Sequence, residues 1–486
     1  MSVLPLLFVV IPVAAAAIIA ILYRVWERSG DIFTNIANLA LLVLSLALVG
    51  PIWRGETFSY NLGDVSPLGI HFTIDGLSLL MLATVSIICL AASLYSVNYM
   101  ERYTAKPRYY VLLMLMIAGM NIVALGADLV NLYIGIEIAA LACYALVAFG
   151  VEHEYLEASF KYQIMGTVGT LCILSGMAFL YRTAGSLNMA ELHGILLGQG
   201  LSPMLLFSGI LFLAGFGLKA AYMPFHAWLP DAHSTAPTPV SAILSGVFIK
   251  VIGLYGMIRV FFCIFEITPT TSWILMVVGA ISLLVAVLLA LGQWDSKRLL
   301  AYHSISQMGY VLLGLGIATP LGILGGLFHL VNHALFKGLL FLDAGSVEMQ
   351  TGTRQLKELG GLNQRMPVTG TTCAIASLSI SGFPPFNGFW SKLIIIIAAI
   401  QAGYLGFAIV AALGSILTMA SFLKLERYIF FGSLPEKWQK VKEAPVLMCV
   451  SMILLAAACL GIGLAFPWII DGFIQPAVNA VMMLGA

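Results

Sequence analysis

The chain has 486 residues, of which 61% are apolar and only 9% are charged, and its formal net charge is +1. Soluble domains carry about a quarter charged residues, so this composition excludes an ordinary soluble protein and indicates a chain embedded in a lipid bilayer. The charges form no basic stripe of the kind that binds a phosphate backbone, which excludes nucleic acid as a partner.

Charged and Pro/Gly-rich breaks divide the sequence into fourteen apolar runs, each about long enough for a helix to cross ~30 Å of hydrocarbon. In chain order the runs are 4–23, 33–50, 74–97, 109–126, 129–150, 161–181, 204–231, 239–262, 272–291, 302–317, 321–344, 368–401, 404–428 and 446–470. The first run lacks a basic segment before it and is too long for a signal-peptide core, so we expect a retained span. The predicted fold class is all-α, a polytopic membrane protein with about fourteen transmembrane helices.

The distribution of the 23 lysines and arginines predicts the orientation. Fifteen lie in segments that follow odd-numbered runs, namely Arg24, Arg28, Arg102, Lys106, Arg108, Lys161, Lys297, Arg298, Arg354, Lys357, Arg365, Arg427, Lys437, Lys440 and Lys442. Only Arg54, Arg182 and Arg259 lie on the opposite side. Because short cytoplasmic loops are rich in Lys and Arg, we expect the odd loops to be cytoplasmic and both termini to lie outside the cell membrane.

Five lysines remain, and they fall inside the apolar runs. They are Lys219, Lys250, Lys337, Lys392 and Lys424. A charge at the bilayer centre costs about 2.5–3.5 kcal/mol on insertion scales, so such lysines call for partners or a function. Glu137 is the only carboxylate that we place near the middle of a run. One acid cannot neutralise five bases, which indicates an ion pathway.

Two of the runs are interrupted. Pro224 and Pro230 follow Lys219 in the seventh run, and the sequence SGFPPFNGFWSK breaks the twelfth run just before Lys392. Proline removes a backbone donor and clashes with the preceding turn, so each site predicts a short non-helical bend. Broken helices at matched positions in two halves of a transporter point to an ion site.

The spacing of the lysines predicts an internal repeat. Lys219 and Lys392 are 173 residues apart, and Lys250 and Lys424 are 174 apart. This offset equals five runs, and an odd number of spans inverts the second copy. We therefore divide the chain into helices 1–3 (1–108), a first repeat of helices 4–8 (109–262), a second repeat of helices 9–13 (272–430), and helix 14 with the tail (431–486).

The stretch GLKAAYMPFHAWLPDAHSTAPTPVSAILSGVFIK, residues 217–250, resembles the signature of antiporter-like subunits shared by respiratory complex I, membrane-bound hydrogenases and Mrp-type cation/proton antiporters. Other segments agree in order, and together they cover about residues 70 to 430: DGLSLL at 75–80, EASFKY at 157–162, DSKRLLAYHSISQMGY at 295–310 and HLVNHALFKGLLFL at 329–342. The resemblance implies fourteen core helices, a five-plus-five inverted repeat, and broken helices seven and twelve.

The resemblance also implies a proton relay. It pairs Glu137 of the fifth helix with Lys219 of the seventh. It continues the relay through Lys250, the set His329, His333 and Lys337, and finally Lys392, a position where some family members carry glutamate. A carboxylate close to a buried lysine favours its charged form, so separating the pair would release the proton. The three residues of the set are spaced by four and share one helical face.

Several residues keep simpler alternatives. Lys219, Lys250 and Lys392 could be structural lysines bound by carbonyls at the bends. Lys424 is near the end of its run, so its side chain could extend to the membrane–water interface. His226 and His233 flank Asp231 in a loop, a pattern that favours capping or proton entry over a metal site. Asp75 and Asp128 stand at predicted helix starts, where an acid is favoured.

The seven cysteines, Cys89, Cys143, Cys172, Cys263, Cys373, Cys449 and Cys459, form no CxxC pair, and we expect them to pack as apolar residues. We expect no cofactor or metal on this chain. The leading functional hypothesis is a subunit that moves protons, or sodium, in a redox-driven pump whose iron–sulfur or nickel–iron chemistry resides in partner subunits. The alternative is a subunit of an Mrp-type Na⁺/H⁺ antiporter without redox chemistry. If the chain were a membrane scaffold without transport, the buried lysines would only lower its stability.

Overall fold

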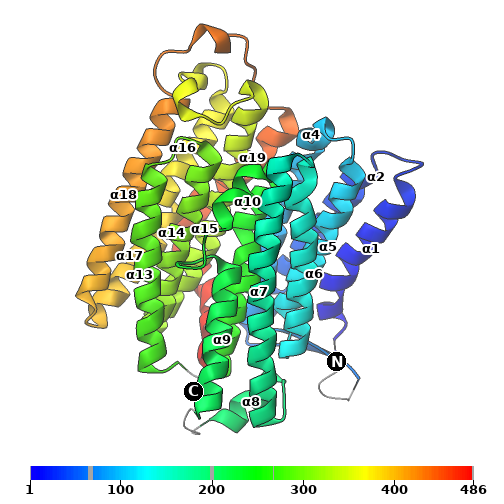
Figure 1. The fold of residues 1–486 in the computed structure, drawn as a ribbon, viewed down its shortest axis with the longest axis vertical. Coiled ribbons are helices and arrows are strands. Elements are labelled where there is room, and N and C mark those ends of the chain that lie inside the picture. The colour runs from blue at the N-terminus through cyan, green and yellow to red at the C-terminus, as the bar shows by residue number, and fades with distance from the viewer. Residues whose placement is uncertain (1, 64–68, 198–201, 266, 484–486) are drawn as a thin grey trace.

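The computed structural model describes residues 2–63, 69–197, 202–265 and 267–483, and in these ranges the chain is a bundle of long helices aligned with the long axis (Figure 1). The helices are α1 Leu4–Leu22, α2 Ser29–Ala47, α3 Val49–Trp53, α4 Gly76–Tyr99, α5 Lys106–Leu125, α6 Leu129–Val147, α7 His153–Ala184, α8 Met189–Leu196, α9 Pro203–Ala220, α10 Leu229–Thr235, α11 Thr238–Ile243, α12 Gly256–Cys263, α13 Pro269–Leu291, α14 Ser296–Gly316, α15 Pro320–Thr351, α16 Pro367–Ser381, α17 Asn387–Gln401, α18 Leu405–Ile429, α19 Val446–Leu464, α20 Phe466–Ile469 and α21 Gln475–Met483. Two strands, β1 Phe58–Leu62 and β2 Ile70–Ile74, form an antiparallel hairpin that the sequence did not predict.

Twelve helical segments in the described ranges are long and apolar enough to cross a membrane, which confirms a polytopic helical membrane protein. The tenth and twelfth predicted runs correspond to α14, which is more polar, and to the shorter helices α16 and α17. Each of the fourteen runs thus falls on helix. The number of fourteen crossings, the inverted repeat and the division into four parts stay predictions.

Both predicted helix breaks are present. The helix α9 ends at Ala220, Ala221 adopts a left-handed conformation with φ 56°, and helical structure resumes with α10 at Leu229. The helix α16 ends at Ser381, Gly382 has φ 82°, and α17 begins at Asn387. Glycine adopts this left-handed conformation without steric cost, which explains why the second break falls there.

Acidic caps fix the starts of two helices, as expected. The side chain of Asp75 accepts a hydrogen bond from the Ser78 amide at 2.8 Å, and Asp128 accepts one from the Asn131 amide at 2.7 Å. Each carboxylate satisfies an amide that the helix leaves unpaired and complements the positive end of the helix dipole.

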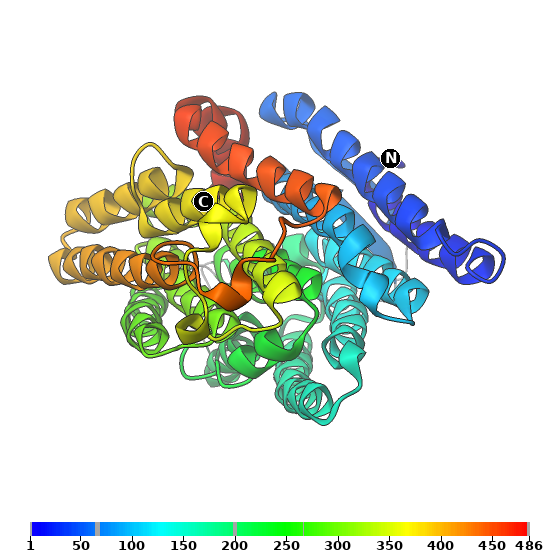
Figure 2. The same ribbon diagram turned by 90° about the horizontal axis from the view of Figure 1, so that it is seen from above.

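The centre of the bundle is formed by α15 and by the segment Thr238–Cys263, which contains α11 and α12. The most apolar window of the first is 94% buried and that of the second is completely buried, whereas only 33% of the α1 window is buried. Figure 2 shows α1 at the edge of the bundle, viewed from above. The central segments therefore carry Lys250 and Lys337 away from lipid.

The basic segments gather at one end of the molecule. Loops 352–366 and 430–445 lie at the top of Figure 1, whereas α8, the start of α1 and the end of α21 lie at the lower end. The chain's first and last helices therefore approach the same face, as an even number of crossings requires. Which face is cytoplasmic stays a prediction.

The structure corrects three details of the sequence analysis. Lys161 lies inside α7 rather than in a loop, since this helix begins eight residues earlier, at His153. The fourteenth predicted run, 446–470, covers α19 and α20, and helical structure then continues beyond it through a π-helical turn into α21. Glu137 is not the only carboxylate well inside a helix, because Asp343, at the end of the predicted run 321–344, lies more than two turns inside α15 and is fully buried.

Candidate functional site

Lys219 lies in the last turn of α9, beside the first break, and is only 2% exposed. Its ammonium group donates to the hydroxyl of Tyr144 at 3.4 Å. Glu137 is half-buried on α6, and its Oε1 has no hydrogen-bond partner in the described part of the chain. The expected ion pair between Glu137 and Lys219 is therefore open in this structure.

Lys250 is fully buried where the helical segment between α11 and α12 winds as a π-helix. Its ammonium group donates to the carbonyls of Ser245 at 2.5 Å and Gly246 at 2.6 Å. The sequence did not predict this π-helical winding, over Leu244–Phe248 and Lys250–Tyr255. Local π-helical turns of this kind occur frequently at functional sites.

The central helix α15 carries His329, His333 and Lys337, all fully buried. The two imidazole rings lie 6.4 Å apart and nearly parallel, so the two histidines share one face of α15. Lys337 donates to the carbonyl of Leu300. Both ring nitrogens of His333 lack a hydrogen-bond partner in the described ranges, so this ring is available to bind water or a proton.

Lys392 lies in the first turns of α17, just after the second break. Its ammonium group donates to the carbonyl of Ile380 at 2.6 Å and lies 4.6 Å from the ring centre of Tyr310. The preceding residue, Ser391, is 2.9 Å from Nδ1 of His329. The second break is thereby connected directly to the histidines of α15.

The predicted site residues form two groups. Lys250 binds the carbonyl of Gly246, which packs against α15 because a Cβ on this glycine would lie 3.4 Å from the Ala334 carbonyl oxygen. Lys392 joins His329 of the same helix through Ser391. Glu137 and Lys219 form the other group. The two groups meet where Gly253 packs against Ala220, because a Cβ on this glycine would lie 2.6 Å from the Ala220 backbone.

Several polar residues of the site escaped sequence analysis. They are Tyr144 beside Lys219, Gln307 at 3.2 Å from Nε2 of His329, Ser391, and His303, which lies 2.8 Å from the Ser421 hydroxyl. The resembling segment 295–310 contains His303 and Gln307, so their presence in a predicted span was a visible signal. Tyr144 and Ser391 carried none, because neither is costly to bury.

The simpler alternatives have mixed outcomes. Lys424 donates to the carbonyls of Leu291 and Gln293, at 2.8 and 2.6 Å, near the end of α13, so it binds a helix terminus near the interface. His233 is buried in α10 and stacks on Phe341 at 4.7 Å. No group of three potential metal ligands occurs in the ranges that the structure describes.

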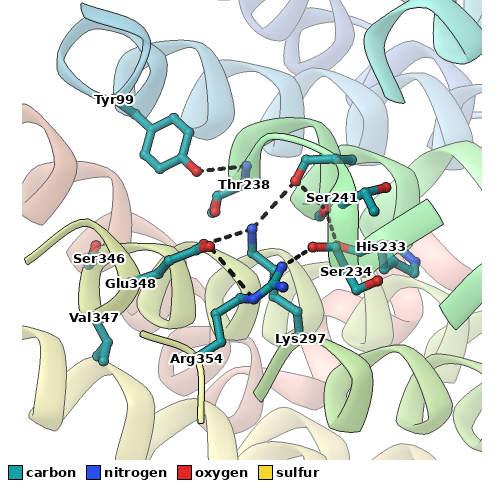
Figure 3. Close-up of polar contacts among 12 residues, drawn as sticks. Tyr99, His233, Ser234, Thr238, Ser241, Lys297, Ser346, Val347, Glu348 and Arg354 are labelled. Carbon is teal, nitrogen blue, oxygen red and sulfur yellow. Dashed lines mark hydrogen bonds and ion pairs between the residues drawn. The ribbon is translucent and has the colours of Figure 1, made fainter. Parts of the chain in front are cut away.

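An ion-pair network around Lys297, Glu348 and Arg354 lies at the basic end of the bundle (Figure 3). Lys297 pairs with Glu348 at 2.8 Å, and Arg354 pairs with Asp295 at 3.2 Å and with Glu348 at 3.8 Å. Arg354 also donates to the Ser234 carbonyl at the end of the first broken segment. The network connects α10, α14 and α15 at this end of the bundle.

A polytopic bundle with two interrupted helices and a line of buried lysines defines the class of ion-transporting membrane proteins. The chain belongs to the family described as "NADH:quinone oxidoreductase/Mrp antiporter, TM", whose signature matches residues 126–418. Residues 61–110 match the "NADH-Ubiquinone oxidoreductase (complex I), chain 5 N-terminus". The family resemblance seen in the sequence is thereby confirmed.

Relatives come from both branches of the family. The chain is 34% identical to NADH-quinone oxidoreductase subunit N of Desulforudis audaxviator, over 98% of each chain. It is also 34% identical to Na⁺/H⁺ antiporter subunit A1 of Staphylococcus haemolyticus, over 97% of this chain and 62% of that longer one. Solved structures of the Mrp complex from Dietzia sp. DQ12-45-1b and of an archaeal membrane-bound sulfane sulfur reductase match over the full chains, each with a TM-score of 0.91 and 26% identity.

Proposed function

We propose that the chain moves protons across the membrane as an antiporter-like subunit of a multi-subunit, redox-driven complex. The observation that carries this proposal is the buried line from Lys250 through His329, His333 and Lys337 to Lys392, which reaches the second helix break. In the part of the chain that the structure describes, none of these basic groups forms an ion pair with a carboxylate. Burying them in this way is costly, and such groups in membranes usually mark proton or ion paths.

The pair Glu137 and Lys219 acts as the switch in this proposal. With the pair open, the one hydrogen bond of the Lys219 ammonium within the described ranges goes to the neutral hydroxyl of Tyr144. A neutral partner stabilises the ammonium less than a carboxylate does, so the open state favours proton release. Closing the pair would return the preference for the charged form. A change of one pKa unit needs only about 1.36 kcal/mol, so a small movement suffices.

A specific observation supports the second candidate, a Na⁺/H⁺ antiporter subunit without redox chemistry. The relatives and the solved structures include both antiporter and respiratory complexes, at equal TM-score. The match over 98% of each chain to an oxidoreductase subunit favours the redox-linked function. Co-purified iron–sulfur or nickel–iron subunits would support this function, and small membrane subunits alone would support the antiporter.

The direct test uses the purified complex in proteoliposomes with a pH-sensitive dye. The variants Glu137→Ala and Lys219→Ala should each abolish proton movement and leave the assembled complex intact. Wild-type transport in either variant would overturn the proposed switch. Sodium-dependent proton movement without an electron donor would assign the antiporter function instead.

A further inference from the structure

Two buried carboxylic acids lie outside the lysine line. Asp343 on α15 is fully buried, and Glu426 on α18 is only 6% exposed. Both face α16, where Thr372 donates to Asp343 at 2.8 Å and Ser377 donates to Glu426 at 2.7 Å. Two successive turns of one helix therefore hold the two acids.

Each acid keeps one oxygen without a partner. Oδ2 of Asp343 and Oε2 of Glu426 are buried and make no hydrogen bond within the described ranges. No lysine or arginine of these ranges forms an ion pair with either acid. An ionised carboxylate buried in this way carries a penalty of several kcal/mol, which a bound proton or cation removes.

The size and lining of the cavity beside Asp343 indicate whether a proton or a cation binds there. A small cavity of about 10 Å³ is lined by Asp343, Cys373 and otherwise apolar side chains, among them Leu300. A hard cation requires a shell of oxygen ligands, and Asp343 is the only lining residue with a side-chain oxygen. At about 10 Å³ the cavity is at the lower size limit for one water molecule, so it admits at most one. Its chemistry therefore suits a proton and a single water.

Leu300 connects this cavity to the lysine line. Its carbonyl accepts the hydrogen bond from Lys337, and the same residue lines the cavity beside Asp343. Along α15, Asp343 follows Lys337 by six residues, or about 9 Å at 1.5 Å per residue, towards the basic end of the bundle. The acids thus stand between Lys337 and that end.

We propose that Asp343 and Glu426 form a second protonatable site, which holds a proton and exchanges it with Lys337 from the basic end. In the exchange, the proton leaves the carboxyl oxygen of Asp343, passes through water in the cavity and binds the Nζ of neutral Lys337, leaving a carboxylate and an ammonium. The exchange rests on the proposed transport function, whereas the holding of the proton does not.

Infrared spectroscopy of the purified complex tests the proton directly. At neutral pH we expect a carboxylic acid C=O band that shifts in D₂O, and both Asp343→Asn and Glu426→Gln should reduce it. The exposed Glu436 on loop 430–445 provides the matched control, because Glu436→Gln should leave the band unchanged. If one variant fails to assemble, the other carries the test. A band unaffected by both variants would overturn the protonatable site.

Proton transport by the same variants tests the exchange with Lys337. We expect Asp343→Asn and Glu426→Gln to slow proton movement about tenfold or more, equivalent to about 1.4 kcal/mol, and Glu436→Gln to leave it unchanged. Loss of the band with normal transport would overturn the exchange. If the variants lose the band but the wild-type complex moves no protons, the protonatable site is supported and the proposed transport function is overturned.

Discussion

The ammonium group of Lys392 is hydrogen-bonded to the carbonyl of Ile380 at 2.6 Å, across the break between α16 and α17. Lys250 is held in the same way by the carbonyls of Ser245 and Gly246. Carbonyls at helix ends and π-helical turns lack their usual partners, so they can accept these bonds. A carbonyl, unlike a carboxylate, leaves no unpaired buried charge when the lysine gives up its proton. Carbonyl binding and proton transfer are therefore compatible.

Replacing Lys392 with methionine separates a structural role from a relay role. We expect Lys392→Met to slow proton movement at least about tenfold, equivalent to ~1.4 kcal/mol, because it removes the last basic group of the line. The matched control is Lys424→Met, which likewise removes a lysine bound to backbone carbonyls, here two of them, but lies near the interface. Dye-based transport in proteoliposomes measures both. Equal loss in the two variants would favour the structural role.

Tyr144 holds Lys219 in the open state, so its hydroxyl should affect transport. In Tyr144→Phe the ammonium loses a hydrogen bond worth about 0.5–1.5 kcal/mol, and we expect proton movement to change several-fold. Tyr162 is the control, since its ring packs 4.6 Å from that of Tyr144 and its hydroxyl has no partner in the described ranges. Tyr162→Phe should transport normally. An unchanged rate in Tyr144→Phe would show that this contact is incidental.

Sequence analysis located the breaks because proline and glycine act locally. Pro224 restricts its own φ and removes a backbone donor, and Gly382 permits a left-handed conformation, so neither effect depends on a distant neighbour. Lysines in apolar runs were equally visible, since burying a charge is costly wherever the chain folds. The positions of both groups of site residues could therefore be predicted.

Features that depend on packing escaped prediction. The π-helical winding at Lys250 accompanies the close approach of Gly253 to Ala220, two segments separated in the sequence. Asp343 was placed at the end of its run, 321–344, because the polar residues after it concealed that α15 continues to Thr351. The open state of Glu137 and Lys219 depends on how α6 and α9 are positioned, and residue spacing does not determine that.

Close packing at Gly253 should be necessary for stability. A Cβ there would meet the Ala220 backbone at 2.6 Å, so Gly253→Ala should cost about 1–3 kcal/mol by overpacking and shift Lys250 relative to Lys219. A Cβ on Gly406 in α18 would meet no atom within 4 Å, and Gly406→Ala should stabilise the helix by about 0.5–1 kcal/mol. Thermal unfolding in detergent compares the two. Equal melting temperatures would contradict the packing argument.

The sidedness of the chain can be measured with single cysteines. Ser433 is exposed on the basic loop 430–445, and Asn61 is exposed on β1 at the other end. In intact cells, a membrane-impermeant maleimide should label Asn61→Cys, and should label Ser433→Cys only after the membrane is opened. The unsubstituted chain controls for its own cysteines. The reverse pattern would place the basic end outside and contradict the predicted orientation.

The ion pair between Asp75 and Arg259 should stabilise the end opposite the basic loops. The carboxylate Oδ1 and guanidinium Nη2 lie 2.8 Å apart, and both side chains are largely buried. Burial opposes ionisation of Asp75, but the charge and hydrogen bond of Arg259 outweigh it and lower the pKa of Asp75 below its usual value. Breaking a buried pair by removing one partner typically costs about 3–5 kcal/mol. We therefore expect Arg259→Gln to lower the melting temperature at neutral pH.

The lowered pKa of Asp75 also fixes the sign of the pH dependence. A group whose folded pKa is depressed stabilises the fold above its unfolded pKa, about 3.9 for aspartate, and loses this contribution as the pH falls through the folded value. The wild type should lose stability below about pH 4, and Asp75→Asn should remove that part of the loss. Melting temperatures across this range, compared with Glu56→Gln at an exposed ion pair, measure the effect. Parallel curves for Asp75→Asn and the wild type would show that the pair does not contribute to acid stability.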